Sequence, residues 1–308
     1  RIFFPAVSGD LYEKLKNENI NIIHTHYLTD ASFFYPFTQK FFCPKICSVY
    51  GYDVSEFPKK FLGLGRQYLK RVFKSYDRIL AMSPDMKDDL LNIGCPEEKI
   101  IIHYYGTDIS RYVNIDKDYE LQNGTIKLLT VASLREKKGH STVLKALSQL
   151  KNKINFQYDI VGDGPLKNQL ISLSKELGIE DQVNFHGHVA YKDNVGFYER
   201  ADVFILTSQE STSGDKEGIP GVIVEGMASG LPIISTYHAG IPHIIKNGFS
   251  GLLANEKDSN KVAEYIENLY NKSSLRKELG DNARNATLSE LNLKVRTLEL
   301  IKIYESLI

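Results

Sequence analysis

Short runs of apolar and β-branched residues recur along the chain, and polar or amphipathic segments separate them. Runs of this kind are typical of strands buried on both faces, so their alternation with helical segments predicts an α/β fold with parallel sheets. The first half of the chain carries four candidate strands, and the second half, from about residue 125, carries six. The candidate strands span residues 21–27, 45–51, 78–83, 99–106, 126–133, 156–164, 183–189, 201–208, 231–237 and 251–255.

A polar stretch at about residues 114–124 separates the two sets of strands. It predicts two doubly wound domains, at residues 1–120 and 121–288, followed by a helical tail at 289–308. Ligands bind sheets of this kind at the carboxyl ends of the strands. Glycine, serine and charged residues gather at such ends after residues 133, 161 and 208, so we expect the functional site there.

The segment EGIPGVIVEGMASG (217–230) holds two glutamates eight residues apart, with a proline and small residues between them. Pro220 suits the first turn of a helix, and Gly230 suits the left-handed residue that ends one. The pattern therefore predicts a short, largely buried helix from about residue 219 to 229. The backbone amides of its first turn, at residues 218–222, lie at the positive end of the helix dipole and can receive a phosphate.

The two glutamates of this segment have different predicted positions. Glu217 lies at the mouth of the anion site, whereas Glu225 lies on the helix and can accept two hydrogen bonds from a vicinal diol such as ribose. Glycine at positions 218 and 221 lets a ligand approach the backbone closely. A buried helix with a capping acid is the alternative interpretation, and the residues around the segment favour the ligand site.

Charge and cysteine content exclude several classes of function. Lysine plus arginine equals aspartate plus glutamate at 38 each, so no global field favours nucleic acid. Cys43, Cys47 and Cys95 lack the spacing of a structural zinc site and are typical of reduced thiols in a cytoplasmic protein. No apolar run reaches the length of a membrane span, and no signal peptide is visible at Arg1, so we expect any membrane contact to be peripheral.

Several ordered motifs carry a resemblance to a known family. The segment ADVFILTSQESTSGDKEGIPGVIVEGMASGLPIISTYHAGIPHIIKNGFSGLLAN closely resembles the retaining glycosyltransferases of family 4, which have the GT-B fold. The resemblance covers nearly the whole chain and is greatest to the exopolysaccharide, capsule and colanic-acid type enzymes. The motifs that carry it are residues 201–255, KKGH at 137–140, VGDGPL at 161–166, VNFHGHV at 183–189 and GYDVS at 51–55.

The resemblance implies two Rossmann-like domains that face across a cleft, the N-terminal one on the acceptor side and the C-terminal one for the nucleotide sugar. It also implies that the tail at 289–308 is the closing helix that crosses back onto the N-terminal domain. Such a domain normally begins with a glycine-rich strand-to-helix loop, whereas this chain opens at Arg1 without one. We therefore expect the N-terminal domain to be incomplete by on the order of 80 residues.

The loop after residue 133 carries three cations before a helix, a pattern that suits a diphosphate. Taken alone, a solvated charge cluster is the alternative interpretation. By resemblance, Lys138 contacts the distal phosphate of the donor. Ser133 stands where the family usually has an arginine, and we expect Arg135 to replace that arginine. The resemblance also implies that Glu217 positions the donor sugar and that Glu225 binds the ribose. The other expected donor-binding residues are Ser133, Gly162, His188, Val189, Gly218, Ile219, Pro220, Gly221 and Val222.

The acceptor side is expected to include His26, Tyr50 and Asp53. His24 and His26 alternate at strand spacing and so share one face, where they either line the acceptor cleft or only fill the end of the strand. Tyr50 stands where the family commonly has a histidine that supports the reaction centre. His243 is a further departure, because relatives usually have glutamate there.

No metal or other cofactor is expected. His186 and His188 also alternate, but no carboxylate or third histidine in the sequence completes a metal site with them. No Asp-x-Asp diphosphate site is evident either.

The segment at 59–78 has seven basic residues, one acid and an apolar stripe. Such a helix can lie on an anionic bilayer. An ordinary amphipathic helix of the domain explains the stripe equally well, and the sequence leaves both readings open.

Together these features predict a retaining glycosyltransferase at the cytoplasmic face of the membrane, in cell-surface polysaccharide biosynthesis. The expected partners are a UDP- or GDP-sugar donor and a saccharide acceptor carried on a lipid. A binding-only relative without transferase activity is the alternative, motivated by Tyr50, Ser133 and His243. An epimerase of sugar nucleotides is a third hypothesis, which the Glu-x7-Glu spacing suits less well.

Overall fold

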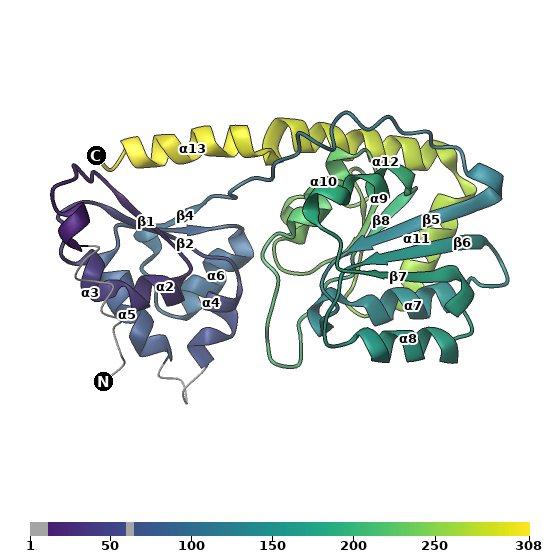
Figure 1. The fold of residues 1–308 in the computed structure, drawn as a ribbon, viewed down its shortest axis with the longest axis horizontal. Coiled ribbons are helices and arrows are strands. Elements are labelled where there is room, and N and C mark those ends of the chain that lie inside the picture. Colours follow the sequence, from purple (N-terminus) through teal and green to yellow (C-terminus); the bar gives the residue numbers. More distant parts are fainter. Residues whose placement is uncertain (1–11, 60–64) are drawn as a thin grey trace. The chain divides into compact units, whose positions relative to one another are not determined.

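The computed structural model describes residues 12–59 and 65–308 (Figure 1). The chain divides into two compact units. Unit 1 comprises the chain up to Tyr105 together with residues 213–218 and 297–308, and unit 2 comprises residues 106–212 and 219–296. Every strand expected from the sequence is present, and all strand pairs within the two sheets are parallel. The predicted α/β fold is therefore confirmed.

The described part of unit 1 holds a four-stranded sheet in the order β1-β2-β3-β4. Its strands are short and apolar, and β2 is buried along its whole length. The strands are β1 (Ile23–His26), β2 (Lys45–Ser48), β3 (Arg78–Ala81) and β4 (Ile100–Ile102). The helices around them are α2 (Leu28–Phe33), α3 (Tyr35–Thr38), α4 (Tyr52–Ser55), α5 (Gly65–Ser75) and α6 (Pro84–Asn92).

Helix α5 is the described part of the basic amphipathic segment, whose residues 60–64 lie outside the described residues. Leu69 and Val72 of this helix, and Tyr76 after it, are fully buried. The helix packs against α2. Most of the described apolar stripe is therefore part of the core of unit 1, whereas Tyr68 is 43% exposed. The basic residues Arg66, Lys70, Arg71 and Lys74 of α5 are exposed as well.

Unit 2, all of whose residues the structure describes, holds a six-stranded sheet in the order β10-β9-β8-β5-β6-β7. Strand order reverses between β5 and β8, and ligands bind at such a switch point in open α/β sheets. The strands are β5 (Thr125–Val131), β6 (Asn155–Val161), β7 (Val183–Gly187), β8 (Val203–Ile205), β9 (Ile233–Thr236) and β10 (Leu252–Ala254).

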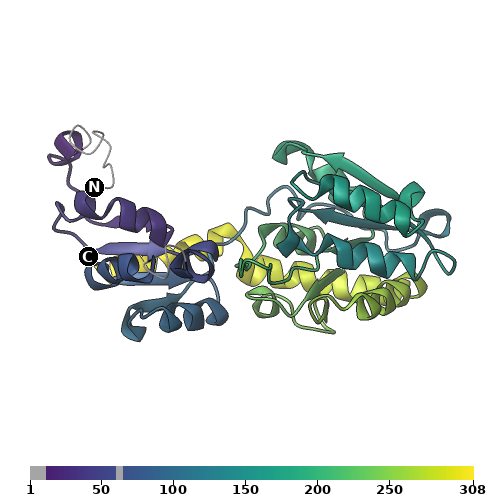
Figure 2. The same cartoon turned by 90° about the horizontal axis from the view of Figure 1, so that it is seen from below.

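Helices cover both faces of this second sheet (Figures 1 and 2). Helix α7 contacts α8 and α11, whereas α10 contacts α12. Buried side chains from the sheet and from α7, α8, α11 and α12 form the core of the unit. The helices are α7 (His140–Ser148), α8 (Lys167–Glu176), α9 (Val195–Arg200), α10 (Gly221–Ala228), α11 (Ser259–Asn271), α12 (Ser273–Ala286) and α13 (Leu293–Glu305).

The boundaries between the units differ from those predicted at residues 120 and 289. The stretch from Gly106 to residue 120 belongs to unit 2, because Thr107 pairs with Asn292 and Lys117 donates to the carbonyls that end α9. Helix α13 begins in unit 2, and its residues from Thr297 onward belong to unit 1.

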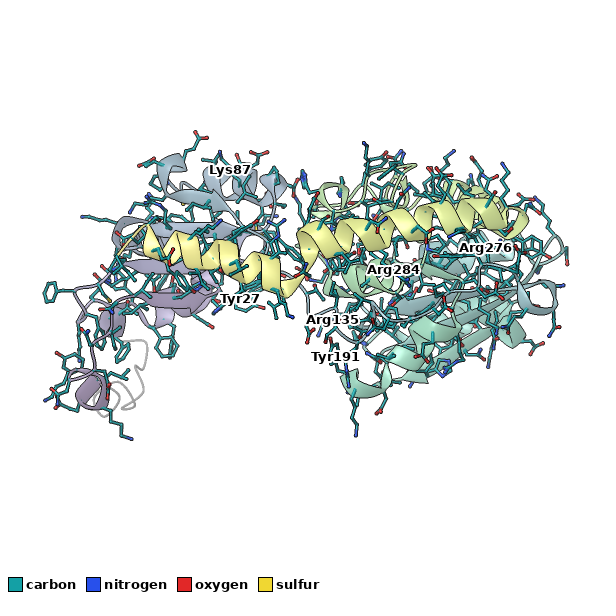
Figure 3. The ribbon with its side chains drawn as sticks, turned by 90° about the horizontal axis from the view of Figure 1, so that it is seen from above. Tyr27, Lys87, Arg135, Tyr191, Arg276 and Arg284 are labelled. Carbon is teal, nitrogen blue, oxygen red and sulfur yellow. The ribbon has the colours of Figure 1, made fainter. Side chains whose placement is uncertain are left out.

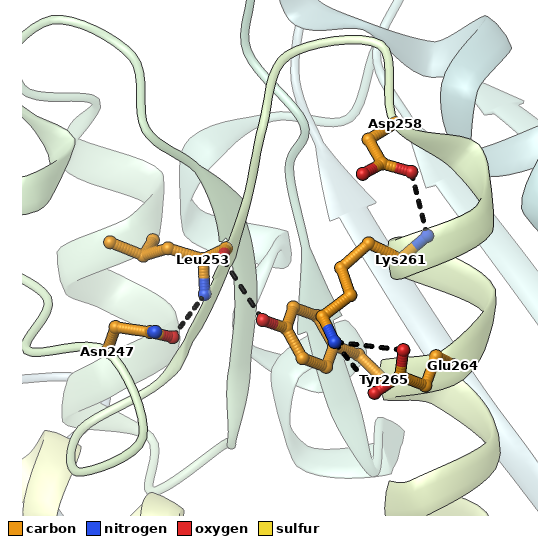
Figure 4. Close-up of polar contacts among 6 residues, drawn as sticks. All are labelled: Asn247, Leu253, Asp258, Lys261, Glu264 and Tyr265. Atoms are coloured by element: carbon orange, nitrogen blue, oxygen red, sulfur yellow. Dashed lines mark hydrogen bonds and ion pairs between the residues drawn. The ribbon is translucent and has the colours of Figure 1, made fainter.

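The free edge of strand β10 is closed by side chains (Figure 4). The Asn247 side chain accepts a hydrogen bond from the Leu253 amide at 2.9 Å, and the Tyr265 hydroxyl donates to the Leu253 carbonyl at 3.2 Å. Asp258 caps the N-terminus of α11 by accepting from the Lys261 amide at 2.9 Å. Because unpaired backbone groups on an edge strand invite pairing with other chains, these contacts protect the sheet.

Three cations cap the C-terminal ends of three helices in unit 2. Lys117 donates to the carbonyls of Tyr198 and Glu199 at the end of α9, and burial lowers the pKa of Lys117 to about 8. Two arginines of α12, Arg276 and Arg284, cap the C-terminal ends of α11 and α10 (Figure 3). Arg284 donates to the carbonyls of residues 228 and 229, and Arg276 to those of residues 269 and 270. Each cation satisfies carbonyls that have no partner inside the helix.

We expect Arg284→Met to lower the free energy of unfolding by about 1 to 3 kcal/mol, because it leaves carbonyls at the end of α10 without a donor. Lys277→Met on the same helix is the matched control, since Lys277 is exposed and its loss should cost about 0.5 kcal/mol or less. Urea unfolding followed by circular dichroism measures both values. Equal losses in the two variants would contradict a capping role for Arg284.

Candidate functional site

The predicted helix of the Glu-x7-Glu segment is present and buried. Helix α10 runs from Gly221 to Ala228, and its residues from Ile223 onward are buried. Gly230 has a φ of 74°, which confirms the left-handed residue predicted after the helix. The helix is shorter than predicted, because Pro220 has an extended ψ of 116° and precedes the first turn instead of lying in it.

Glu225 of α10 is a buried carboxylate with a defined partner. Glu225 is only 6% exposed, and its Oε2 accepts a hydrogen bond from the Tyr198 hydroxyl at 2.7 Å. Burial raises the pKa of Glu225, while the neighbouring hydroxyls of Tyr198 and Tyr112 act in the opposite direction. Tyr198 and Tyr112 pack edge to face, with ring centroids 5.0 Å apart. Sequence reasoning did not single out either tyrosine.

Lys138 lies in a turn that is tied to the end of strand β8. The 3-10 helix η5 (Glu136–Lys138) follows β5. The Glu136 carboxylate accepts hydrogen bonds from the Thr212 amide at 3.1 Å and from its hydroxyl at 2.8 Å. Gly139, with a φ of 68°, follows the turn, and a methyl group there would lie 1.8 Å from the Thr207 carbonyl oxygen. Only glycine fits, so the Lys-Gly pair fixes where Lys138 leaves the backbone.

The glycine turn after β6 lies against the loop after β5. A methyl group at Gly162 would lie 1.9 Å from the Ala132 carbonyl oxygen, and the Leu134 amide donates to the Asp163 carbonyl at 3.0 Å. The turn therefore packs directly on the backbone that carries Ser133. Arg135 is exposed (Figure 3). It lines a cavity of about 530 Å³ together with His140 and residues of α8.

His140, at the start of α7, is almost fully buried. Its Nε2 lies 3.1 Å from the Ser133 carbonyl oxygen and donates to it. Burial lowers the pKa of His140 to about 4, so the ring is neutral at pH 7. This neutral histidine holds the loop that precedes Lys138.

The histidines at the end of β7 differ from the prediction. His186 lies 2.8 Å from the Asp159 carboxylate on β6, a neighbour that the sequence did not reveal because it comes from another strand. Gly187 has a φ of 70° and ends the strand, so the alternation that was predicted to place His186 and His188 on one face stops there. Within residues 12–59 and 65–308, no three His, Cys, Asp or Glu side chains gather as a metal site would require. His188 and Val189 follow the strand, and His188 is exposed.

Glu217 belongs to unit 1, whereas Glu225 belongs to unit 2. A methyl group at Gly51 would lie 3.1 Å from the Lys216 carbonyl oxygen, and one at Gly218 would lie 3.2 Å from the Tyr50 carbonyl oxygen. The backbone around Glu217 therefore packs on the loop of Tyr50 and Gly51. The two glutamates lie in one segment of the sequence, but Glu217 has its neighbours in unit 1 and Glu225 has its neighbours in unit 2.

The two histidines of β1 share a face, as predicted, and their rings stack with centroids 4.6 Å apart. His24 is hydrogen-bonded to the hydroxyls of Tyr304 at 2.6 Å and of Ser48 at 2.8 Å. Burial lowers the pKa of His24 to about 4, so this histidine fastens α13 within unit 1 as a neutral ring. His26 contacts the Tyr50 hydroxyl through Nδ1.

An aromatic cluster surrounds Tyr50. The rings of Tyr27 and Tyr105 lie 4.7 and 5.7 Å from that of Tyr50, and both are partly exposed. Tyr27 has a φ of 66°, a conformation that is costly for a residue other than glycine and that concentrates at functional sites. The three tyrosines follow the carboxyl ends of β1, β2 and β4.

Asp53, which was expected in the acceptor cleft, is fully buried. Its carboxylate accepts hydrogen bonds from the backbone amides of Leu28, Tyr50 and Gly51 at 2.9 to 3.2 Å. Because a buried carboxylate needs such donors, Asp53 holds the loop of Tyr50 in place and does not line a surface.

The loop after β9 contains a second buried histidine. His243 is exposed on the 3-10 helix η8 (Ile241–His243), whereas His238 is buried and bonded to Glu256 at 2.6 Å. His238 and Glu256 each follow the end of a strand by two residues, and β9 and β10 are parallel neighbours. That spacing is the sequence signal that could have revealed the pair.

Comparison with known proteins identifies the family. Residues 113–286 match the model of glycosyl transferases group 1, and residues 1–111 match that of glycosyltransferase family 4. The chain belongs to the group 1 glycosyltransferases. Within residues 12–59 and 65–308, no helix combines the length and apolar character that a membrane span requires.

Two curated relatives are named as biosynthetic glycosyltransferases. A Salmonella typhimurium glycosyltransferase assigned provisionally to colanic acid biosynthesis is 33% identical, over 71% of this chain and 53% of its own length. The amylovoran biosynthesis glycosyltransferase of Erwinia amylovora is 32% identical, over 77% of this chain and 58% of its own length. The chain thus spans about half the length of the curated relatives it matches.

A solved structure gives the same fold. The Anabaena protein HepE in complex with UDP-glucose has a TM-score of 0.81 and is 17% identical, over 98% of this chain and 82% of its own.

We expect stability to fall as the pH drops from about 6.5 toward 4. The pKa of His140 in the folded protein, about 4, lies below its ordinary value of 6.5, so the unfolded chain binds the proton first. The loss from His140 is at most about 3 kcal/mol. Urea unfolding at pH 7.5 and pH 5 should show a smaller loss in His140→Gln than in the unaltered protein.

The control for this experiment is His243→Gln, which removes an exposed histidine and should keep the full pH dependence. Burial also raises the pKa values of Asp53 and Glu225, which opposes the effect, but this contribution is common to all variants and cancels in the comparison. An unchanged pH dependence in His140→Gln would refute the role of His140.

Proposed function

We propose that this chain transfers a sugar, with retention at the anomeric carbon, from a UDP- or GDP-sugar to a saccharide acceptor in cell-surface polysaccharide synthesis. The observation that carries the proposal is the buried Glu225 carboxylate on α10, with Tyr198 bonded to one of its oxygens. A carboxylate held in this way suits the vicinal hydroxyls of a ribose. The group 1 family and the named activities of the relatives support the proposal.

In this proposal unit 2 binds the donor. Glu225 accepts hydrogen bonds from the ribose, and backbone groups of His188 and Val189 hold the base. Lys138 and Arg135 balance the charge of the diphosphate. The backbone amides at residues 218–222 receive the distal phosphate, and Ser133 and Gly162 shape the backbone around it.

The chemical step breaks the bond between the anomeric carbon and the donor phosphate oxygen and forms one to the acceptor oxygen. The electron pair of the broken bond stays on the leaving diphosphate, whose growing charge Lys138 and the amides stabilise. The leaving phosphate takes the proton of the acceptor hydroxyl, and Glu217 positions the donor sugar. Because the cations and amides balance the diphosphate, the proposal requires no metal.

Unit 1 supplies the acceptor site. The partly exposed rings of Tyr27, Tyr50 and Tyr105, with His26 beside them, suit a saccharide, because sugar C–H groups pack on aromatic faces. The basic surface of α5 suits contact with an anionic bilayer on the cytoplasmic side, where a lipid-linked acceptor would lie. Since Leu69, Val72 and Phe73 of α5 are buried in the unit and only Tyr68 of its apolar residues is exposed, this contact would be mainly electrostatic.

We expect UDP or GDP to bind when UDP, GDP and ADP are compared, and Glu225→Ala to weaken that binding by about 1 to 3 kcal/mol, the cost of losing a charge-assisted hydrogen bond. Calorimetry on the unaltered chain and the variant measures this. Glu264→Ala, at an exposed glutamate of α11, is the control and should bind as the unaltered chain does. If none of the three nucleotides binds, the proposal is wrong.

We expect Lys138→Ala to lower the rate of donor turnover by about 100-fold, because it removes a cation that stabilises the leaving diphosphate. Lys137→Ala, the adjacent lysine of the same turn, should change the rate less than about threefold. Release of UDP or GDP from the matching sugar nucleotide is the measurement. Nucleotide binding without any turnover, in the unaltered chain and in Tyr50→His, would favour the binding-only alternative.

A further inference from the structure

The contact between Tyr198 and Glu225 is a hydrogen bond between two buried groups at the proposed ribose site. The Tyr198 hydroxyl donates to Oε2 of Glu225 at 2.7 Å, and the tyrosine is fully buried. Glu225 thus has one oxygen already engaged within the protein. A hydroxyl donor beside a buried carboxylate stabilises its charged form and fixes its rotation.

Tyr198 is itself firmly held. Its ring stacks on that of Phe204 in β8, with centroids 5.8 Å apart, and lies edge to face with that of Tyr112. Lys117 donates to the Tyr198 carbonyl at 3.1 Å and closes the end of α9. The hydroxyl therefore reaches Glu225 from a fixed element, as a positioning group requires.

Tyr112 adds a second hydroxyl near the same carboxylate. It is fully buried, and its hydroxyl has no hydrogen-bond partner among the described residues. Burial and then the charge of Glu225 raise the pKa of Tyr112, so its hydroxyl stays protonated and remains a donor. A buried donor without a partner is costly. The Glu225 carboxylate and the Tyr191 hydroxyl are the polar side chains that act on the Tyr112 hydroxyl, and of the two only the carboxylate can carry a charge at pH 7.

We propose that Tyr198 and Tyr112 are positioning residues that hold the Glu225 carboxylate for the ribose diol of the nucleotide. The inference rests on the proposed function, because it gives these tyrosines a role in the same donor site. They act through Glu225 and do not touch the ribose themselves. Their hydroxyls make the site selective for a nucleotide with an intact 2′-hydroxyl, since only that ligand offers both hydroxyls to the aligned carboxylate.

The test compares UDP with 2′-deoxy-UDP, or the corresponding pair for the base that binds, by calorimetry. We expect the unaltered chain to prefer the ribonucleotide by about tenfold or more. Tyr198→Phe should reduce that preference to about twofold, mainly through weaker binding of the ribonucleotide. Tyr112→Phe, which removes a hydroxyl without a hydrogen bond and so should fold, is expected to reduce the preference by about threefold.

Tyr158→Phe is the matched control. Tyr158 is also fully buried, but its hydroxyl bonds to Thr130 at 2.8 Å inside the core. This variant should lose stability and keep the ribonucleotide preference, which separates a positioning role from a structural one. Thermal unfolding of each variant shows how much of the protein is folded.

The outcomes separate this inference from the proposed function. If no nucleotide binds the unaltered chain, the proposed function fails. If the preference is lost in Glu225→Ala but kept in both Tyr198→Phe and Tyr112→Phe, the proposed function stands and the positioning role is overturned. Loss of the preference in either tyrosine variant, with the control unchanged, supports it.

Discussion

The burial of helix α10 is the constraint on which the rest of unit 2 depends. Its residues from Ile223 to Ala228 are buried. The backbone carbonyls at the C-terminal end of the helix must therefore find hydrogen-bond donors in other parts of the protein. Arg284 supplies that partner by donating to the carbonyls of Ala228 and Ser229. The same guanidinium group bonds to the carbonyl of Ile115, which ties the segment that precedes the sheet to the end of this helix. A helix fixed in this way can carry a charged side chain into the interior of the unit.

Burying Glu225 on this helix opposes its ionisation, and the neighbouring elements offset that cost. Tyr198 comes from α9, whose C-terminal carbonyls accept hydrogen bonds from Lys117, a residue of unit 2 that precedes strand β5. Lys117 thus holds the end of the helix that carries Tyr198, and the Tyr198 hydroxyl in turn holds the Glu225 carboxylate. Each one orders the backbone or side chain that the next one needs, so a change far from the carboxylate can alter its orientation.

Each unit holds some of the candidate functional residues. Lys138 and Glu225 have their neighbours in unit 2, while Glu217 packs with the loop of Tyr50 in unit 1. In unit 1 the neutral His24 fastens the end of α13 through Tyr304, and Asp53 holds the loop of Tyr50 by its backbone amides. Buried polar side chains therefore fix the loops in both units, and the loops carry the exposed chemistry.

The sequence by itself determined the fold class, all the strands and the buried helix of the Glu-x7-Glu segment. It could do so because strand and helix periodicity, the glycine after the helix and the turn residues are local properties of the chain. It also determined the family, through motifs that remain in order along the chain. The sequence placed the start of α10 only approximately, because a proline with a fixed φ allows either an extended or a helical ψ.

Only the tertiary structure decided which residues meet. Tyr198 precedes Glu225 by 27 residues, and Asp159 precedes His186 by the same separation, so no local pattern reveals either pair. The burial of Asp53 and the assignment of Glu217 to unit 1 depend on the packing of loops that are distant along the chain. Local sequence sets secondary structure through steric and periodic preferences. The partners of a buried polar group are set by the path of the whole chain, because only that path decides which donors and acceptors are left to satisfy one another.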